Sequence, residues 1–464
     1  MRSDEARDAG YLLGDALGTA TRSIGQVHDA ISTRVFGLLG PPARPVQLVH
    51  DAIAGSVYGI VRGSTRLAPR VGGVLAARSR PADAPSIADH PTGNALLGAL
   101  NGAWGDAIAQ GYRGLAYPMA VRSAGRTVQV TPGGLAAAHP AATGRIAVFL
   151  HGLCETDDSW RLGSQTYYGD ATTSFGSRLQ EDLGWTPVYL RYNTGLHVSD
   201  NGRRFAQLMQ ALVDCWPVPV DEVALLGHSM GGLVMRSACH YAQNPPGDRP
   251  PLSWTQALRH AFHLGTPHLG APLEVRTAKL SARLARVPET APLARLLNSR
   301  SVGVKDLRHG SLLDEDWTGV ELDTFLDDTC AEVPFLPDAH YYYIGATLHR
   351  SPDHPVSAIL GDLLVLLPSA SGQSSTGQSS TGQGGTGQGG TGQGGTRTIP
   401  FEVERGRHLG GITHFHLLNH PAVYEQIRLW LMPQTPAVVV EDARGEAGED
   451  GTAKDMPQLP ASGQ

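Results

Sequence analysis

The sequence predicts an α/β protein with a mostly parallel sheet and helices on both faces, and three observations support this prediction. Apolar stretches of strand length alternate with longer helical stretches between residues 118 and 433. Most of these short stretches lack the polar alternation of a strand with one solvated face, as expected of buried parallel strands. One of them runs directly into a Gly-x-Ser-x-Gly turn followed by an apolar helix.

Residues 1–115 predict a helical region with an internal repeat. The segment "VHDAISTRVFG" at 27–37 returns as "VHDAIAGSVYG" at 49–59, and prolines separate the copies. Apolar residues recur at helical spacing in each copy, so we expect two helices that pack through a shared apolar face. Lone histidines in such a pattern usually lie on the helix surface, and we interpret His28 and His50 in this way rather than as ligands.

Residues 116–433 carry the predicted α/β domain. A strand pair is expected around Ala124 and Gly125, and the segments 145–152, 186–192, 222–228, 260–266 and 341–347 read as buried strands. Helical stretches at 202–216 and 231–242 lie between them. This alternation is typical of a parallel sheet whose helices cover both faces.

Three further segments interrupt or follow this domain. Residues 272–336 carry Leu and Val at helical spacing, and we expect a helical cap over one end of the sheet. Residues 372–396 consist of five pentapeptides without an apolar residue, which predicts a disordered surface loop. The acidic residues 434–464 predict a disordered tail.

Charge and composition exclude several classes of protein. The formal charge is -6 and the pI is about 6.3, so a nucleic-acid partner is not expected. Four scattered cysteines without a CxxC pair indicate thiols in a reducing compartment. Neither a signal peptide nor an apolar run of membrane-spanning length stands out, so we expect a cytoplasmic protein, with peripheral membrane contact left open.

The segment "VALLGHSMGG" at 223–232 is the strongest functional signal. It fits the nucleophile elbow, in which a strand turns sharply into a helix and lifts a serine hydroxyl above the sheet edge. Gly227 and Gly231 suit the turn because a Cβ at either position would collide with neighbouring backbone. Ser229 is therefore the candidate nucleophile.

A serine hydroxyl needs a histidine base and an acid that orients the base. In this architecture the acid and then the histidine follow the serine in the chain. Three candidate bases, His414, His416 and His420, precede the final amphipathic helix. Two candidate acids, Asp353 and Asp362, follow the strand at 341–347.

Several motifs resemble those of the lipase-like α/β hydrolases, including the branch related to GPI inositol deacylases. "THFHLL" resembles the lipase segment with the catalytic histidine, which implies that His414 is the base. "GDLLVLLPSAS" resembles the segment with the acid, which implies Asp362, although Leu363 stands where lipases often have glycine. "FLHGLCE" resembles the oxyanion loop, so the backbone N-H of Leu153 would join that of Met230 in the oxyanion hole. "HLGTPHLGAP" resembles a loop of the same group, in which His268 would support the pocket.

The resemblance implies a carboxylic ester hydrolase that acts on small-molecule or lipid esters through an acyl-enzyme, without a metal or organic cofactor. Transfer of the acyl group to an alcohol or amine is an alternative outcome of the same chemistry. A binding protein that retains the fold is a second alternative. A metal site at His408, His414, His416 and His420 is a weaker one, because their spacing fits no familiar zinc pattern.

Overall fold

The computed structural model describes residues 1–81, 84–288, 290–319, 330–351, 354, 362, 364–373 and 397–432. Nearly all of the loop predicted to be disordered at 372–396 and the whole tail at 434–464 lie outside the described residues. The limits of the predicted domains therefore stay predictions. No helix among the described residues is long and apolar enough to cross a membrane.

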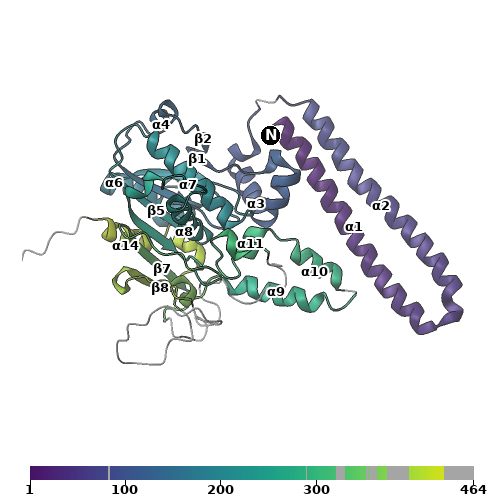
Figure 1. Cartoon of the computed structure of the whole chain (residues 1–464). Helices are drawn as coiled ribbons and strands as arrows, with labels where there is room; N and C mark the ends of the chain where they lie inside the picture. The colour runs from purple at the N-terminus through teal and green to yellow at the C-terminus, as the bar shows by residue number, and fades with distance from the viewer. Residues whose placement is uncertain are drawn as a thin grey trace, which may run out of the picture.

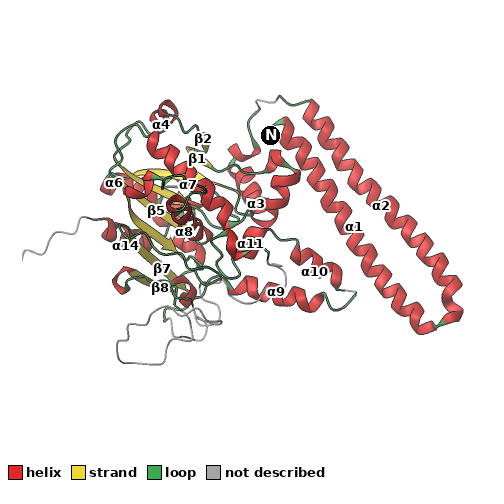
Figure 2. Cartoon of the chain, in the orientation of Figure 1, coloured by secondary structure: helices red, strands yellow, loops and turns green. Residues whose placement is uncertain are grey.

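Among the residues that the structure describes, one eight-stranded sheet forms the centre of the body (Figure 2). Its order is β2-β1-β4-β3-β5-β6-β7-β8. Strands β3 to β8 run parallel to one another, whereas β1 is antiparallel to both β2 and β4. The strands are β1 Ala120–Ser123, β2 Arg126–Val128, β3 Arg145–Leu150, β4 Thr186–Arg191, β5 Glu222–His228, β6 Leu258–Leu264, β7 His340–Thr347 and β8 Gly406–Gly410. The predicted fold class, the strand pair and the five buried strands are confirmed, and β8 was not predicted.

Helices cover both faces of this sheet. Along β3, Ile146 and Val148 point into one apolar cluster with α7 and α8, and Phe149 points into another with α6 and α14. This alternation follows from the two-residue period of a strand. The helices are α4 Pro132–Ala138, α5 Ser164–Tyr168, α6 Phe175–Leu183, α7 Val198–Asp214, α8 Met230–Gln243, α13 Leu367–Ala370 and α14 Pro421–Leu431.

The described part of the expected cap segment includes the helices α9 Pro272–Leu284, α10 Ala291–Asn298 and α11 Val302–Asp306. Inside it, Glu274 is buried and pairs with Arg300 at 2.6 Å and with Arg308 at 3.2 Å. This shared carboxylate ties the start of α9 to the segments that follow α10 and α11.

The N-terminal region forms a long antiparallel hairpin of α1 Ser3–Leu39 and α2 Arg44–Arg78, which projects from the body, and a third helix, α3 Pro91–Gly111, against the body (Figure 1). The expectation that α1 and α2 share an apolar face was wrong. Glycines and polar groups line their contact: a methyl group on Gly14 would lie 2.4 Å from the Arg66 carbonyl oxygen, and the His28 and His50 rings stack at 5.1 Å. The two histidines therefore lie between the helices. Because the small residues allow the backbones to approach closely, most of the apolar side chains of α1 and α2 are exposed to solvent.

Candidate active site

Ser229 lies at the apex of the predicted elbow, between β5 and α8. Its φ is 52° and its ψ is -121°, a strained conformation for a residue with a side chain. A methyl group on Gly227 would lie 2.6 Å from the Gly232 nitrogen, and one on Gly231 would lie 2.4 Å from the Leu150 carbonyl oxygen. The sharp turn thus requires both glycines, for the steric reason expected from the sequence.

His414 and Asp362 meet although 52 residues separate them in the chain. The imidazole Nδ1–H of His414 donates to Oδ2 of Asp362 at 2.7 Å, and both side chains are buried. The other carboxylate oxygen accepts the backbone N–H groups of Leu364 and Val365 at 3.0 and 2.8 Å. The carboxylate is therefore fixed on both sides and holds the imidazole in one orientation.

This pairing shifts the pKa of both groups. Burial alone would raise the pKa of Asp362, but the charge and hydrogen bond of His414 and the two backbone N–H groups lower it below its ordinary value. Burial alone would lower the pKa of His414, but the Asp362 carboxylate, with a smaller contribution from Glu155, raises it. The pair thus favours an ionised acid and a strengthened base.

Ser229 and His414 lie at the same carboxyl edge of the parallel strands. The Ser229 backbone N–H donates to the carbonyl oxygen of Leu264 at 2.8 Å, and a methyl group on the adjacent Gly265 would lie 3.0 Å from the His414 ring. The Nε2 atom of His414 is buried and has no hydrogen-bond partner within the described part of the chain. The nitrogen that a serine base requires is therefore unoccupied, and no hydrogen bond joins it to Ser229 in this conformation.

A second buried pair connects the parts of this site. Glu155 accepts the Gly152 backbone N–H at 2.6 Å and contacts His228 Nδ1 at 3.0 Å, while His228 Nε2 lies 3.1 Å from the His414 carbonyl oxygen. Both ring nitrogens of His228 therefore lie within hydrogen-bond distance of an oxygen atom. Burial alone would raise the pKa of Glu155, but the interaction with His228 and the Gly152 N–H lower it.

Sequence reasoning missed the contact between Glu155 and His228. His228 was visible only as the variable residue before Ser229, and Glu155 only as the last residue of the loop motif. Their pairing links the predicted oxyanion loop, the elbow and the loop that carries His414. An ionisable residue within or next to each of two motifs is the signal that could have suggested it.

The two predicted oxyanion donors flank Ser229 on different elements. Met230 is the first residue of α8, so its backbone N–H has no acceptor within the helix. Leu153 follows Gly152, which packs against Ser229: a methyl group on Gly152 would lie 3.0 Å from the Ser229 Cβ. The next residue, Cys154, has a φ of 63° and lies against α3, where a methyl group on Gly102 would be 2.3 Å from its sulfur.

The alternative residues have other contacts. His416 Nδ1 accepts the Thr413 backbone N–H at 2.9 Å, and the His420 side chain caps α14 by accepting the Ala422 N–H at 3.2 Å. His268 is buried, with Nδ1 3.4 Å from the Arg236 guanidinium, and its supporting role stays a prediction. Asp353 lies outside the described residues.

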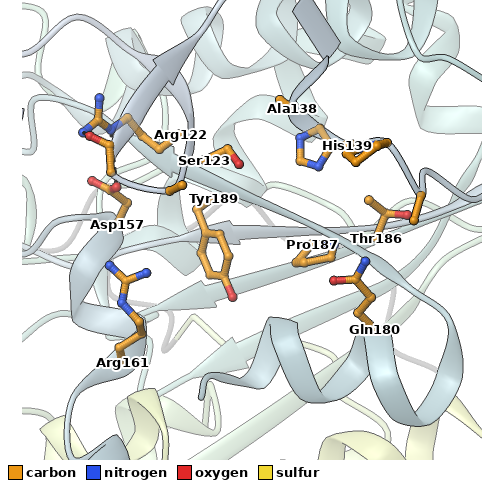
Figure 3. A pocket seen from close by; sticks show the side chains of 14 residues that line it. Arg122, Ser123, Ala138, His139, Asp157, Arg161, Gln180, Thr186, Pro187 and Tyr189 are labelled. Atoms are coloured by element: carbon orange, nitrogen blue, oxygen red, sulfur yellow. Dashed lines mark hydrogen bonds and ion pairs between the residues drawn. The ribbon is translucent and has the colours of Figure 1, made fainter. Parts of the chain in front are cut away.

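A cavity of about 220 Å³ lies elsewhere, over β4 and α6 (Figure 3). Arg122 and Asp157 line it and pair with each other at 3.3 Å, and Arg122 also donates to Thr127 at 2.8 Å. None of the predicted site residues lines this cavity. The partners of Arg122 come from the protein itself.

A comparison with known protein families finds a match over part of the chain. Residues 141–329 match the family model described as a PGAP1-like alpha/beta domain. None of the curated proteins matches the chain.

Several solved structures are similar at low identity. The mature lipase BlEst2 of Bacillus licheniformis is 14% identical, over 62% of this chain and 91% of its own, with a TM-score of 0.36. Lipase 1 of Pelosinus fermentans is 13% identical, over 63% and 100%, with a TM-score of 0.36. Phospholipase PlaB of Legionella pneumophila is 18% identical, over 49% and 45%, with a TM-score of 0.28. At these TM-scores the similar structures add nothing to the family match and the observed sheet.

Proposed function

We propose that the chain is a lipase-like member of the α/β-hydrolase superfamily and that it hydrolyses carboxylic esters through an acyl-enzyme formed on Ser229. The observation that carries this proposal is the His414–Asp362 hydrogen bond of 2.7 Å at the sheet edge that also carries the elbow. It leaves the other imidazole nitrogen without a hydrogen-bond partner among the described residues. Asp362 orients the ring and His414 acts as the base.

In the proposed reaction the Ser229 oxygen attacks the ester carbonyl while His414 Nε2 takes the hydroxyl proton. A change in the Ser229 rotamer or a small closure of the His414 loop is needed to bring these two atoms into hydrogen-bond distance. The backbone N–H groups of Leu153 and Met230 stabilise the negative charge on the carbonyl oxygen, each by about 3 kcal/mol. His414 then gives its proton to the leaving alcohol.

The acyl group is released by the reverse sequence of proton transfers. His414 takes a proton from water, the hydroxide oxygen attacks the acyl carbonyl, and Ser229 leaves with the proton returned by His414. The chain's own side chains and backbone supply every group in these steps. A lipid ester or a smaller ester is a suitable substrate.

The test is hydrolysis of p-nitrophenyl esters with acyl chains of 4, 8 and 12 carbons by the full-length protein, with analysis of the acid produced. Substitution of Ser229→Ala or His414→Ala is expected to lower kcat by roughly 10⁴-fold or more. His416→Ala is the matched control, since it removes a histidine of the same loop, and it should retain most of the activity. Wild-type turnover that survives Ser229→Ala would refute the proposal.

A further inference from the structure

A cavity of about 230 Å³ lies against one side of the α1–α2 hairpin. The residues that line it come from both helices: Asp15, Gly18, Thr19 and Arg22 from α1, and Arg62 and Arg66 from α2. Intervals of three and four residues place the members from each helix on one helix face. Both helices therefore direct guanidinium groups to the same cavity.

The guanidinium groups of this cavity are largely unused within the protein. Arg22 and Arg62 form no ion pair or side-chain hydrogen bond in the part of the chain that the structure describes. Arg66 donates to Asp15 through Nε at 2.9 Å, and its two Nη nitrogens form no hydrogen bond with a described residue. Each guanidinium has five N–H donors in a planar arrangement. The cavity thus contains many donors that lack a protein acceptor.

Asp15, the acidic residue of the lining, does not neutralise this group. Its Oδ1 accepts Arg66 and Arg70 at 2.9 and 2.6 Å, and its Oδ2 accepts the Tyr112 hydroxyl at 2.7 Å. Burial alone would raise the pKa of Asp15, but the hydrogen bonds of Arg70 and Tyr112 and the charges of both arginines lower it. The carboxylate is ionised and fully engaged, and three arginines with one aspartate give the lining a formal charge of +2.

The surrounding sequence adds little compensating charge. Between residues 16 and 66 the acidic residues are Asp29 and Asp51, and there is no glutamate. Asp29 follows Arg22 by seven residues, about 10 Å along α1, and Asp51 precedes Arg62 by eleven residues, about 16 Å along α2. Arginines gathered around one cavity repel one another, so an anion from solution is favoured there.

The charge and the donors of the lining fit a phosphate group better than a carboxylate. A phosphate monoester carries about 1.5 to 2 negative charges at pH 7 and has three strong acceptor oxygens. Planar guanidinium groups bind such oxygens in pairs. The Thr19 hydroxyl, which has no hydrogen bond with a described residue, is a further donor. A carboxylate would bring one charge and two oxygens, and would leave part of the lining unpaired.

The position of the cavity on the arm favours a small soluble ligand. On α1 the exposed apolar side chains of Leu13, Leu17 and Ile24 lie roughly 140–180° around the helix from Arg22. A phosphate held in a lipid surface would have to be reached by the polar side of the arm, with these apolar side chains turned toward water. A soluble molecule enters the cavity without that cost.

We propose that this cavity binds a soluble phosphate group, either free phosphate or the monoester of a small molecule. Arg22, Arg62 and Arg66 donate to the phosphate oxygens. Because the bound group accepts hydrogen bonds from α1 and α2 together, it bridges the two helices and stabilises the hairpin. The site is separate from Ser229, so this binding is independent of the proposed ester chemistry.

The test is isothermal titration calorimetry of the full-length protein with sodium phosphate and with glycerol 3-phosphate, with sodium chloride of equal ionic strength as the reference. Wild type should bind phosphate but not chloride. Tighter binding of glycerol 3-phosphate would identify a monoester as the ligand, whereas equal or weaker binding would identify free phosphate. Arg22→Gln with Arg62→Gln should weaken the binding of both by at least about tenfold, because two charged donors are lost.

The matched control is Arg44→Gln with Arg78→Gln, which removes the same charge from α2 outside the cavity. Both arginines are exposed, and neither lines the cavity. Phosphate affinity of this control should stay within about twofold of wild type, since a screened surface charge contributes little at such a distance. Circular dichroism checks that each variant is folded, and saturating phosphate should raise the melting temperature of wild type more than that of the cavity variant.

Three results would overturn the proposal. The first is folded wild type that binds phosphate and glycerol 3-phosphate no better than chloride. The second is a folded cavity variant with wild-type affinity. The third is equal loss of affinity in the cavity variant and the control, since the net charge of the arm would then explain the binding.

Discussion

Substitution of Glu155→Gln tests whether the buried Glu155–His228 pair positions the proposed catalytic groups. Glu155 accepts the Gly152 backbone N–H at 2.6 Å and contacts His228 at 3.0 Å, and His228 in turn contacts the His414 carbonyl oxygen. Glutamine has nearly the same shape, so the substitution removes the charge and leaves the packing intact. The loop that carries Leu153 and the loop that carries His414 would then be held by weaker bonds.

The size of the effect follows from these contacts. Hydrogen bonds to a charged group contribute about 1.5–3 kcal/mol, and neutral ones about 1 kcal/mol. Replacement of two charge-assisted bonds by two neutral bonds therefore costs about 1–2 kcal/mol. At 1.4 kcal/mol for each factor of ten, kcat/KM should fall by about 5- to 30-fold.

The assay is kcat and KM for p-nitrophenyl butyrate, with thermal unfolding measured in parallel. The loss should appear mainly in kcat, because Glu155 acts through groups that stabilise the transition state. Glu425→Gln is the control: this exposed carboxylate pairs with Arg428 at 2.9 Å and should leave kcat unchanged. A folded Glu155→Gln protein with wild-type kcat would refute the positioning role.

Three other predictions concern the His414–Asp362 pair, the contact of α3 with the Cys154 loop and the α1–α2 hairpin. The rate should rise with pH as His414 loses its proton, with a midpoint above the ordinary histidine pKa. Asp362→Asn should move this midpoint to lower pH, because it removes the charge that raises the pKa of His414. Profiles of kcat/KM against pH check both expectations, and an unchanged midpoint in Asp362→Asn would argue against the pairing. Gly102→Val should lower kcat and destabilise the fold by about 1–3 kcal/mol, since even a methyl group there would lie 2.3 Å from the Cys154 sulfur. Denaturant unfolding and ester turnover measure these effects. Wild-type values for both would show that α3 does not support the loop that carries Leu153 and Cys154. Gly14→Leu should destabilise the hairpin by a similar amount, since α1 and α2 would have to separate. In thermal melts followed by circular dichroism, the helical signal should be lost at a lower temperature than in wild type. An unchanged melting curve would contradict the close contact of the two helices.

The sequence was sufficient for the central sheet and for the elbow because their signals are local. Buried strands such as 222–228 are apolar throughout, and the turn at Ser229 needs its glycines within a few residues. The strand β8, "GRHLG", carries no such signal, and its position is set by pairing with β7. Local patterns therefore identify strands with strong burial and miss those that depend on a neighbour.

The base and acid required more than local pattern. Order along the chain narrowed the choice to three histidines and two aspartates, and only the resemblance to lipases selected His414 and Asp362. The Glu155–His228 pair could not be deduced, because it joins residues 73 positions apart through a contact that no periodicity encodes. Specific buried charges of this kind become visible only when the strand ends are assembled.

The hairpin shows a different limit of sequence reasoning. The repeat predicted two helices, but each helix has an apolar stripe beside a stripe of glycine and histidine, about 100° apart. Burial of the apolar stripe is the simpler expectation. Close approach at Gly10 and Gly14, together with the polar contacts of His28 and Ser32, instead places the small and polar stripe between the helices.

The most direct test of the catalytic proposal is the rate at which a fluorophosphonate labels the protein, with the modified peptide identified by mass spectrometry. Labelling of wild type should occur at Ser229, should vanish in Ser229→Ala and should slow by at least about 100-fold in His414→Ala. Modification of a different residue, or equal rates in wild type and His414→Ala, would contradict the proposal that Ser229, His414 and Asp362 act as one unit.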